Sequence, residues 1–155
     1  MTTVVELLAA EQVTFCVDTN ILIEFQALAS LPWHELAPAA TSIRIIVPTK
    51  VGAEMDEHKF SSGRLRKRAA EFSDLVRRLE QNNYAPINLR DARPLVTFEF
   101  GALFKAKDLD GEQFELTDAD NRVVAEVFRT SVDVPALVFM ADAARSCGRI
   151  PNLRY

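Results

Sequence analysis

The chain has 155 residues, of which 48% are apolar and 26% charged, a composition typical of one globular domain (residues 1–155) and not of a disordered segment. Its 18 basic and 22 acidic residues give a net charge of −4, which argues against a uniformly basic surface that coats nucleic acid but does not exclude a nucleic acid substrate. No apolar stretch approaches the roughly 20 residues that span a bilayer, the first dozen residues lack the basic start of a signal peptide, and two cysteines are too few for a disulfide framework. We therefore expect a cytoplasmic protein with no membrane partner.

The first half of the chain alternates strand and helix patterns. Residues 13–17 are β-branched and aromatic and predict a strand, which a turn at residues 18–20 follows. A helix is expected next, with Asn20 as its N-cap and Pro32 at its end. A second strand at residues 43–47 ends at Pro48, and a helix over residues 50–59 follows it.

The second half is less regular. Residues 63–82 predict a long helix with a clean apolar stripe, whereas residues 84–116 give only one possible strand, at 95–100. A helix at 118–130, a buried strand at 136–140 and a short helix at 142–147 complete the pattern. This order predicts an α/β domain, a three-layer sandwich in which helices cover both faces of a mostly parallel sheet. Ligands of such sheets bind beyond the carboxyl ends of the strands.

Four acids are expected near that edge. Asp18 directly follows the first strand, and Asp142 follows the late strand after one intervening residue. Glu54 lies one helical turn beyond the second strand, among apolar residues of its helix. Asp120 shares a face with three valines of its helix, whereas the neighbouring Asp118 points outward. Each also has a plainer explanation: a turn or cap for Asp18 and Asp142, a solvated edge for Glu54, and a capping box with Thr117 for Asp120.

Oxygen ligands of this kind suit Mg²⁺ or Mn²⁺ and not zinc, and the chain has only two histidines. Such ions activate water and stabilise the leaving oxygen when a phosphodiester is hydrolysed. The acids, taken together, predict a divalent metal site that acts on phosphodiesters.

The four acids fall in four segments: Val17-Asp18-Thr19-Asn20-Ile21-Leu22, residues 47–55 with Glu54, Asp120-Asn121-Arg122-Val123-Val124, and residues 137–142 ending in Asp142. These segments resemble the motifs of the PIN-domain family of metal-dependent ribonucleases, in the family's order and over nearly the whole chain, with Glu54 at the acidic position of the second motif. The chain departs from the pattern at Met140, where the family commonly has Ser or Thr, and in offering both Asp118 and Asp120 for one position.

The resemblance implies a PIN-like fold and an RNA-cleaving activity, with Asp18, Glu54, Asp120 and Asp142 as catalytic metal ligands and Asp118 as an alternative ligand. It also implies that Thr19 and Asn20 organise the first acid and contact substrate. Many small bacterial members are toxins, so a toxin–antitoxin pair, with an antitoxin protein as partner, and a homodimer are further expectations.

Substrate contacts are expected from a basic cluster that follows the helix of Glu54. Its members are Lys59, Arg64, Arg66, Lys67 and Arg68, with no acid between residues 59 and 68. Such residues position a phosphate backbone without specifying its sequence, although a solvated helix face gives the same pattern. Trp33 and Tyr84 are candidates for stacking on bases, or for partly buried packing.

Two other hypotheses compete with the ribonuclease. Met140 and the doubled third acid also fit a catalytically degenerate PIN-like module that binds RNA or a protein. A receiver-like or phosphohydrolase domain with Asp18 as nucleophile is a third hypothesis. Asn20 in place of a second Asp, and the lack of a phosphate-binding Lys after the last strand, count against it.

Overall fold

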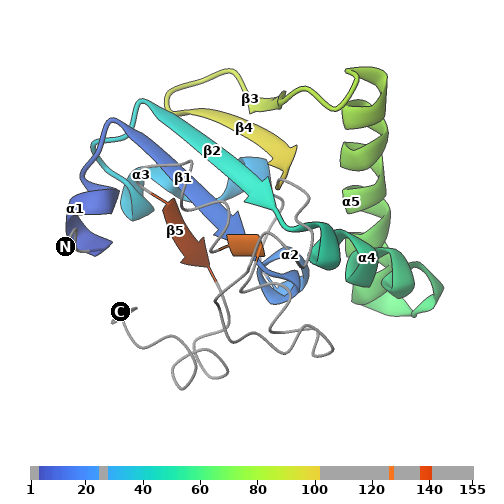
Figure 1. Cartoon of the computed structure of the whole chain (residues 1–155). Helices are drawn as coiled ribbons and strands as arrows, with labels where there is room; N and C mark the ends of the chain where they lie inside the picture. The colour runs from blue at the N-terminus through green and yellow to red at the C-terminus, as the bar shows by residue number, and fades with distance from the viewer. Residues whose placement is uncertain (1–3, 25–27, 102–125, 128–136, 141–155) are drawn as a thin grey trace, which may run out of the picture.

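Apolar residues that alternate along the strands build a central sheet, and helices follow several of these strands along the chain (Figure 1). The structure, a computed structural model, describes residues 4–24, 28–101, 126–127 and 137–140. Within these residues the sheet has five strands in the order β3-β4-β2-β1-β5. They are β1 (Gln12–Val17), β2 (Ser42–Val47), β3 (Ile87–Arg90), β4 (Leu95–Phe100) and β5 (Leu137–Met140). β3 runs antiparallel to β4 and the other pairs are parallel, so the expected α/β class with a mostly parallel sheet is confirmed.

One face of the sheet is apolar because side chains alternate along each strand. The parallel register sets Phe15 of β1 beside Ile45 of β2, and Ile45 beside Phe98 of β4. All three are buried. Trp33 of α3 (Trp33–Leu36) packs on Phe15 with ring centroids 5.3 Å apart, and Phe72 of α5 (Gly63–Gln81) packs edge-on against Phe98 at 6.2 Å. Each fully buried ring or branched side chain contributes about 1.5–3 kcal/mol, so this face is the main source of stability.

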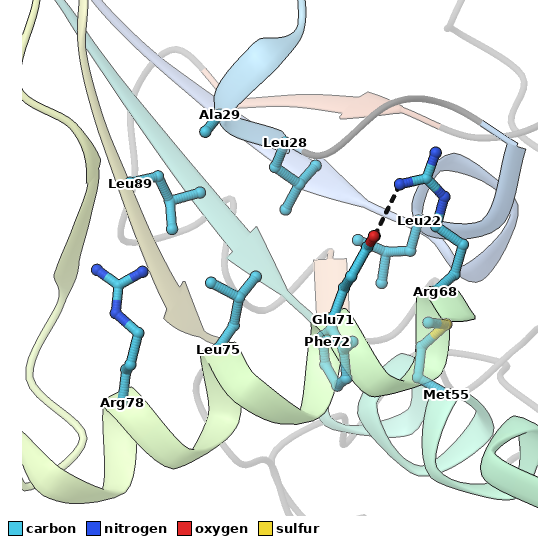
Figure 2. Close-up of a pocket in the computed structure, with 10 residues that line it drawn as sticks. All are labelled: Leu22, Leu28, Ala29, Met55, Arg68, Glu71, Phe72, Leu75, Arg78 and Leu89. Carbon is cyan, nitrogen blue, oxygen red and sulfur yellow. Dashed lines mark hydrogen bonds and ion pairs between the residues drawn. The ribbon is translucent and has the colours of Figure 1, made fainter. Parts of the chain in front are cut away.

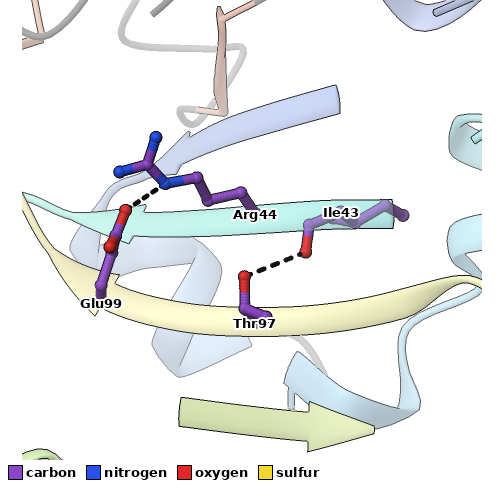
Figure 3. A network of polar contacts seen from close by, with 4 residues as sticks. All are labelled: Ile43, Arg44, Thr97 and Glu99. Atoms are coloured by element: carbon purple, nitrogen blue, oxygen red, sulfur yellow. Dashed lines mark hydrogen bonds and ion pairs between the residues drawn. The ribbon is translucent and has the colours of Figure 1, made fainter. Parts of the chain in front are cut away.

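The opposite face is more polar, and an ion pair joins two of its strands (Figure 3). Glu99 of β4 is only 8% exposed, and its carboxylate accepts a hydrogen bond from Arg44 Nε on β2. On the same pair of strands, the Thr97 hydroxyl donates to the Ile43 carbonyl at 3.5 Å. A buried carboxylate is tolerated only when it is paired, so Arg44 explains how an acid fits in the middle of a strand pattern.

Helices lie beyond the carboxyl ends of β1 and β2. Figure 1 shows α2 (Thr19–Glu24) and α4 (Thr49–Glu57) next to the arrowheads of these strands. The 3-10 turn η2 (His58–Phe60) joins α4 to α5, and a second 3-10 turn, η1 (Leu28–Ser30), precedes α3. Before β1 in the chain, α1 (Val4–Leu8) contacts β5.

Several expectations need correction. The helix after β1 begins at Thr19 with Asp18 as its cap, so Asn20 is not the N-cap. The expected single helix up to Pro32 is wrong, because α2 ends at Glu24 and a separate 3-10 turn spans residues 28–30. α3 and β3 were not expected at all. Of the helices expected at 118–130 and 142–147, residues 126–127 are helical, and the remainder lies outside the described residues.

Candidate metal centre at the sheet edge

Asp18 stands where β1 ends and α2 begins. Its Oδ1 accepts a hydrogen bond from the Ile21 backbone N–H at 3.0 Å, the interaction of an N-cap residue. The side chain is half-buried. The capping role suggested by the sequence is therefore real, and it leaves the second carboxylate oxygen out of the cap.

A side-chain contact holds Glu54, which is on α4, next to α2, the helix that follows β1. β1 and β2 are parallel neighbours, so α2 and α4 start at the same edge of the sheet. The Thr19 hydroxyl donates to Glu54 Oε2, which links these two helices directly. On the other side, Lys50 Nζ lies 4.0 Å from Glu54 Oε1, one turn earlier on α4. The geometry thus brings Asp18 and Glu54 to one edge, with Thr19 between their helices.

A third acid at this edge is Glu126, which the sequence pattern did not single out. It is 4% exposed, and both of its oxygens bind Thr49, the first residue of α4. The Thr49 backbone N–H donates to Oε2 and the Thr49 hydroxyl donates to Oε1, each at 2.6 Å. Glu126 therefore caps the helix that carries Glu54. Its signal in the sequence is weak, since Glu126 adjoins Val127 at the border of an apolar stripe.

Gly52 gives a second reason for the position of α4. A Cβ on this residue would lie 3.0 Å from Cε1 of Phe100, closer than side-chain carbons normally approach. Glycine costs about 1 kcal/mol relative to alanine inside a helix. Here it lets α4 lie against the end of β4, which holds the helix near the sheet edge.

The pKa of the Cys16 thiol, two residues before Asp18, is affected by the acids of this edge. Burial raises its pKa, and the nearby carboxylates of Glu126 and Asp18 raise the pKa further. Cys16 therefore stays a thiol. Cys16 is a buried residue of β1.

The remaining predicted acids, Asp118, Asp120 and Asp142, lie outside the described residues. The backbone of β5 nevertheless ends beside β1, because Met140 pairs with Val17. The chain thus leaves the sheet at Met140 next to the point where Asp18 follows β1. Within residues 4–24, 28–101, 126–127 and 137–140, no three His, Cys, Asp or Glu side chains are grouped closely enough to hold a metal ion.

Three predicted substrate contacts already have partners within the chain. Lys59 pairs with Asp56, and Arg68 pairs with Glu71 at 2.7 Å. Arg64 donates to the Ile23 carbonyl at 3.1 Å, which ties the start of α5 to α2. Asn20 is half-buried beside Thr19. That these residues contact substrate stays a prediction.

The two aromatic residues proposed for base stacking have different surroundings. Trp33 is fully buried, and its Nε1 donates to the Leu28 carbonyl at 2.9 Å, so it is a core residue. Tyr84 is 60% exposed just beyond the end of α5.

A cavity of about 150 Å³ lies between α5 and the α2–η1 region (Figure 2). Its walls are mainly apolar side chains, among them Leu28, Leu75 and Leu89, and the Arg68–Glu71 ion pair closes one side. Of the candidate acids that the structure describes, neither Asp18 nor Glu54 lines it.

No protein-family model, curated protein or solved structure matches the chain. No helix among the described residues is both long enough and apolar enough to cross a membrane.

Proposed function

We propose that the protein is a metal-dependent ribonuclease with a PIN-like, three-layer α/β/α fold, which hydrolyses RNA phosphodiester bonds. The observation that supports this most is the link between Thr19 and Glu54. It holds Glu54 at the edge where Asp18 follows β1, so two acids of the expected motifs share one place in the fold. Parallel sheets bind their ligands at this edge.

The donor set fits a hard divalent cation. Asp18 and Glu54 offer carboxylate oxygens, and Asp120 and Asp142, with Asp118 as the alternative third acid, would complete an oxygen-only site for Mg²⁺ or Mn²⁺. A bound ion of this kind activates water and stabilises charge on the phosphate. The chain's own contribution is orientation: the Ile21 N–H fixes the Asp18 carboxylate, and the Thr19 hydroxyl fixes that of Glu54.

Cleavage of a single-stranded RNA with Mn²⁺ or Mg²⁺ tests the proposal in Asp18→Asn and Glu54→Gln variants. Asparagine also caps helices well, so Asp18→Asn should preserve α2. Loss of a group that only supports a metal ligand reduces activity by up to roughly 100-fold. Asp18 and Glu54 are proposed as ligands themselves, so each substitution should reduce the cleavage rate by at least this much. Glu57→Gln, an exposed acid at the end of the same helix, is the matched control and should keep full activity. Equal metal-dependent cleavage by wild type and Asp18→Asn would refute the role of Asp18.

A second candidate function is a catalytically silent PIN-like module that binds RNA or a protein. The specific observation in its favour is that both oxygens of Glu54 face donors of the chain, Thr19 and Lys50. Calorimetric titration with Mn²⁺ separates the two functions. An active site should bind the ion and lose binding in Glu54→Gln, whereas a silent module should give no binding heat in either protein.

The biological setting belongs to the same proposal. We place the protein in the cytoplasm, as the toxin of a toxin–antitoxin pair, with RNA as substrate, an antitoxin as partner and a homodimer as its form. A small antitoxin gene adjacent to its own gene would support this setting. Co-expression of that neighbour should suppress RNA cleavage in the assay above, and unchanged cleavage would contradict it.

A further inference from the structure

Phe60 is an apolar side chain without a packing role. It ends η2, the 3-10 turn between α4 and α5, and 93% of it is exposed to solvent. This is the largest exposed fraction among the large apolar side chains of the described residues, ahead of Val5 and Tyr84. Aromatic side chains normally bury most of their surface, and a ring that is left in solvent is accessible for stacking.

The ring adjoins the basic cluster. From residue 59 to residue 70 the chain carries five cations and no acid. Arg66 and Lys67 lie in the first turns of α5, and both are exposed. In the part of the chain that the structure describes, neither has an ion-pair partner, unlike Lys59 and Arg68. Positive charge is therefore available within seven residues of the exposed ring, on the helix that η2 contacts.

The exposed ring also lies close to Glu54 along the chain. Glu54 and Phe60 are six residues apart on consecutive helical turns, which corresponds to about 9 Å along the axis at the α-helical rise. A strand bound at the edge of the sheet can therefore reach the ring with a neighbouring nucleotide.

We propose that Phe60, Arg66 and Lys67 form a platform for single-stranded RNA, on which a base stacks on the ring of Phe60 and the two cations contact adjacent phosphates. This inference rests on the proposed ribonuclease function and names how its substrate is held. Stacking on aromatic side chains is tolerant of sequence, and cationic neighbours are the usual companions of such rings.

Fluorescence anisotropy with a labelled single-stranded oligoribonucleotide tests this, in EDTA so that cleavage cannot interfere. Phe60→Ala and Phe60→Leu should weaken binding roughly 5- to 100-fold, the usual effect of losing one stacked base, whereas Phe60→Trp should retain it. Val5→Ala is the control, since it removes an exposed apolar side chain of α1, outside the basic cluster and outside every candidate binding residue. The control should bind as wild type does.

Two further arms separate stacking from other contacts. Replacing Arg66 and Lys67 by glutamine should reduce the slope of log K against log salt by about 1.4 if each contacts one phosphate. Duplex RNA of the same sequence should bind Phe60→Ala and wild type alike, because its bases are not free to stack. Thermal melting should show unchanged stability for all Phe60 variants, since 93% of the side chain is exposed.

The proposal is overturned if Phe60→Leu binds as tightly as wild type, if Val5→Ala weakens binding equally, or if Phe60 is needed for anionic phosphatidylserine vesicles and not for RNA. Failure of the ribonuclease function looks different. In that case Phe60-dependent binding persists while metal-dependent cleavage is absent. If cleavage depends on Asp18 but RNA binding does not depend on Phe60, only the platform fails.

Discussion

The contact between Glu126 and Thr49 makes a quantitative prediction about stability. Thr49→Val removes the hydroxyl that donates to Glu126 Oε1 at 2.6 Å and keeps the shape and helix propensity of the residue. The carboxylate is 4% exposed, so water cannot easily replace the lost donor. A hydrogen bond to a charged group contributes about 1.5–3 kcal/mol, and we expect a loss of unfolding free energy in this range.

Urea unfolding followed by the fluorescence of Trp33, the sole tryptophan, measures this change. Thr41→Val is the control, because the exposed Thr41 hydroxyl donates to a backbone carbonyl, that of Glu11, at 3.2 Å. It should cost less than about 0.5 kcal/mol. In a double-mutant cycle with Glu126→Ala, Thr49 and Glu126 should show a coupling of about 1–2 kcal/mol. Equal losses for Thr49→Val and Thr41→Val, or no coupling, would refute the view that Glu126 anchors α4.

Two further predictions concern the more polar face of the sheet and its edge. Arg44→Met leaves the buried Glu99 without its cation, and urea unfolding should show a loss of about 1–3 kcal/mol, part of which Arg44→Met/Glu99→Leu recovers; a single variant as stable as wild type would contradict this. The raised pKa of Cys16 means that the folded state keeps a proton that the unfolded state loses above about its ordinary value of 9.0. Stability should therefore fall with rising pH above 9 by up to about 1.4 kcal/mol per unit, and Cys16→Ala should lack that part of the slope, whereas parallel pH profiles would count against it.

The elements with strong local patterns were predictable from the sequence. Residues 13–17, 43–47 and 95–100 form strands, and residues 63–81 form the long helix, with Ala69, Phe72 and Leu79 buried along the expected stripe. These signals arise from side-chain period and are local. The segment after β1 was misjudged because Asp18, and not Asn20, supplies the cap, and two acceptable caps within three residues cannot be separated by residue type.

The contacts between distant segments were not predictable. Glu126 binds a residue 77 positions away, and Arg44 binds one 55 positions away. In both cases the sequence shows only a charged residue in a helix or strand pattern, and the partner depends on which elements the fold sets side by side. The position of Thr19 against Glu54 is of the same kind: the motif indicated that Thr19 belongs to the site, but not which acid its hydroxyl binds.

Each described acid at the sheet edge has donors from the chain itself. Asp18 is bound by the Ile21 N–H, Glu54 by the Thr19 hydroxyl and Glu126 by both donors of Thr49. Carboxylates gathered at one edge repel one another, and these donors offset that repulsion without any added cation. The fold of this edge is therefore expected to persist in EDTA. It follows that a loss of RNA cleavage on chelation reports on the chemistry of the site and not on unfolding, which makes the metal-free protein a valid reference for both the cleavage and the RNA-binding experiments.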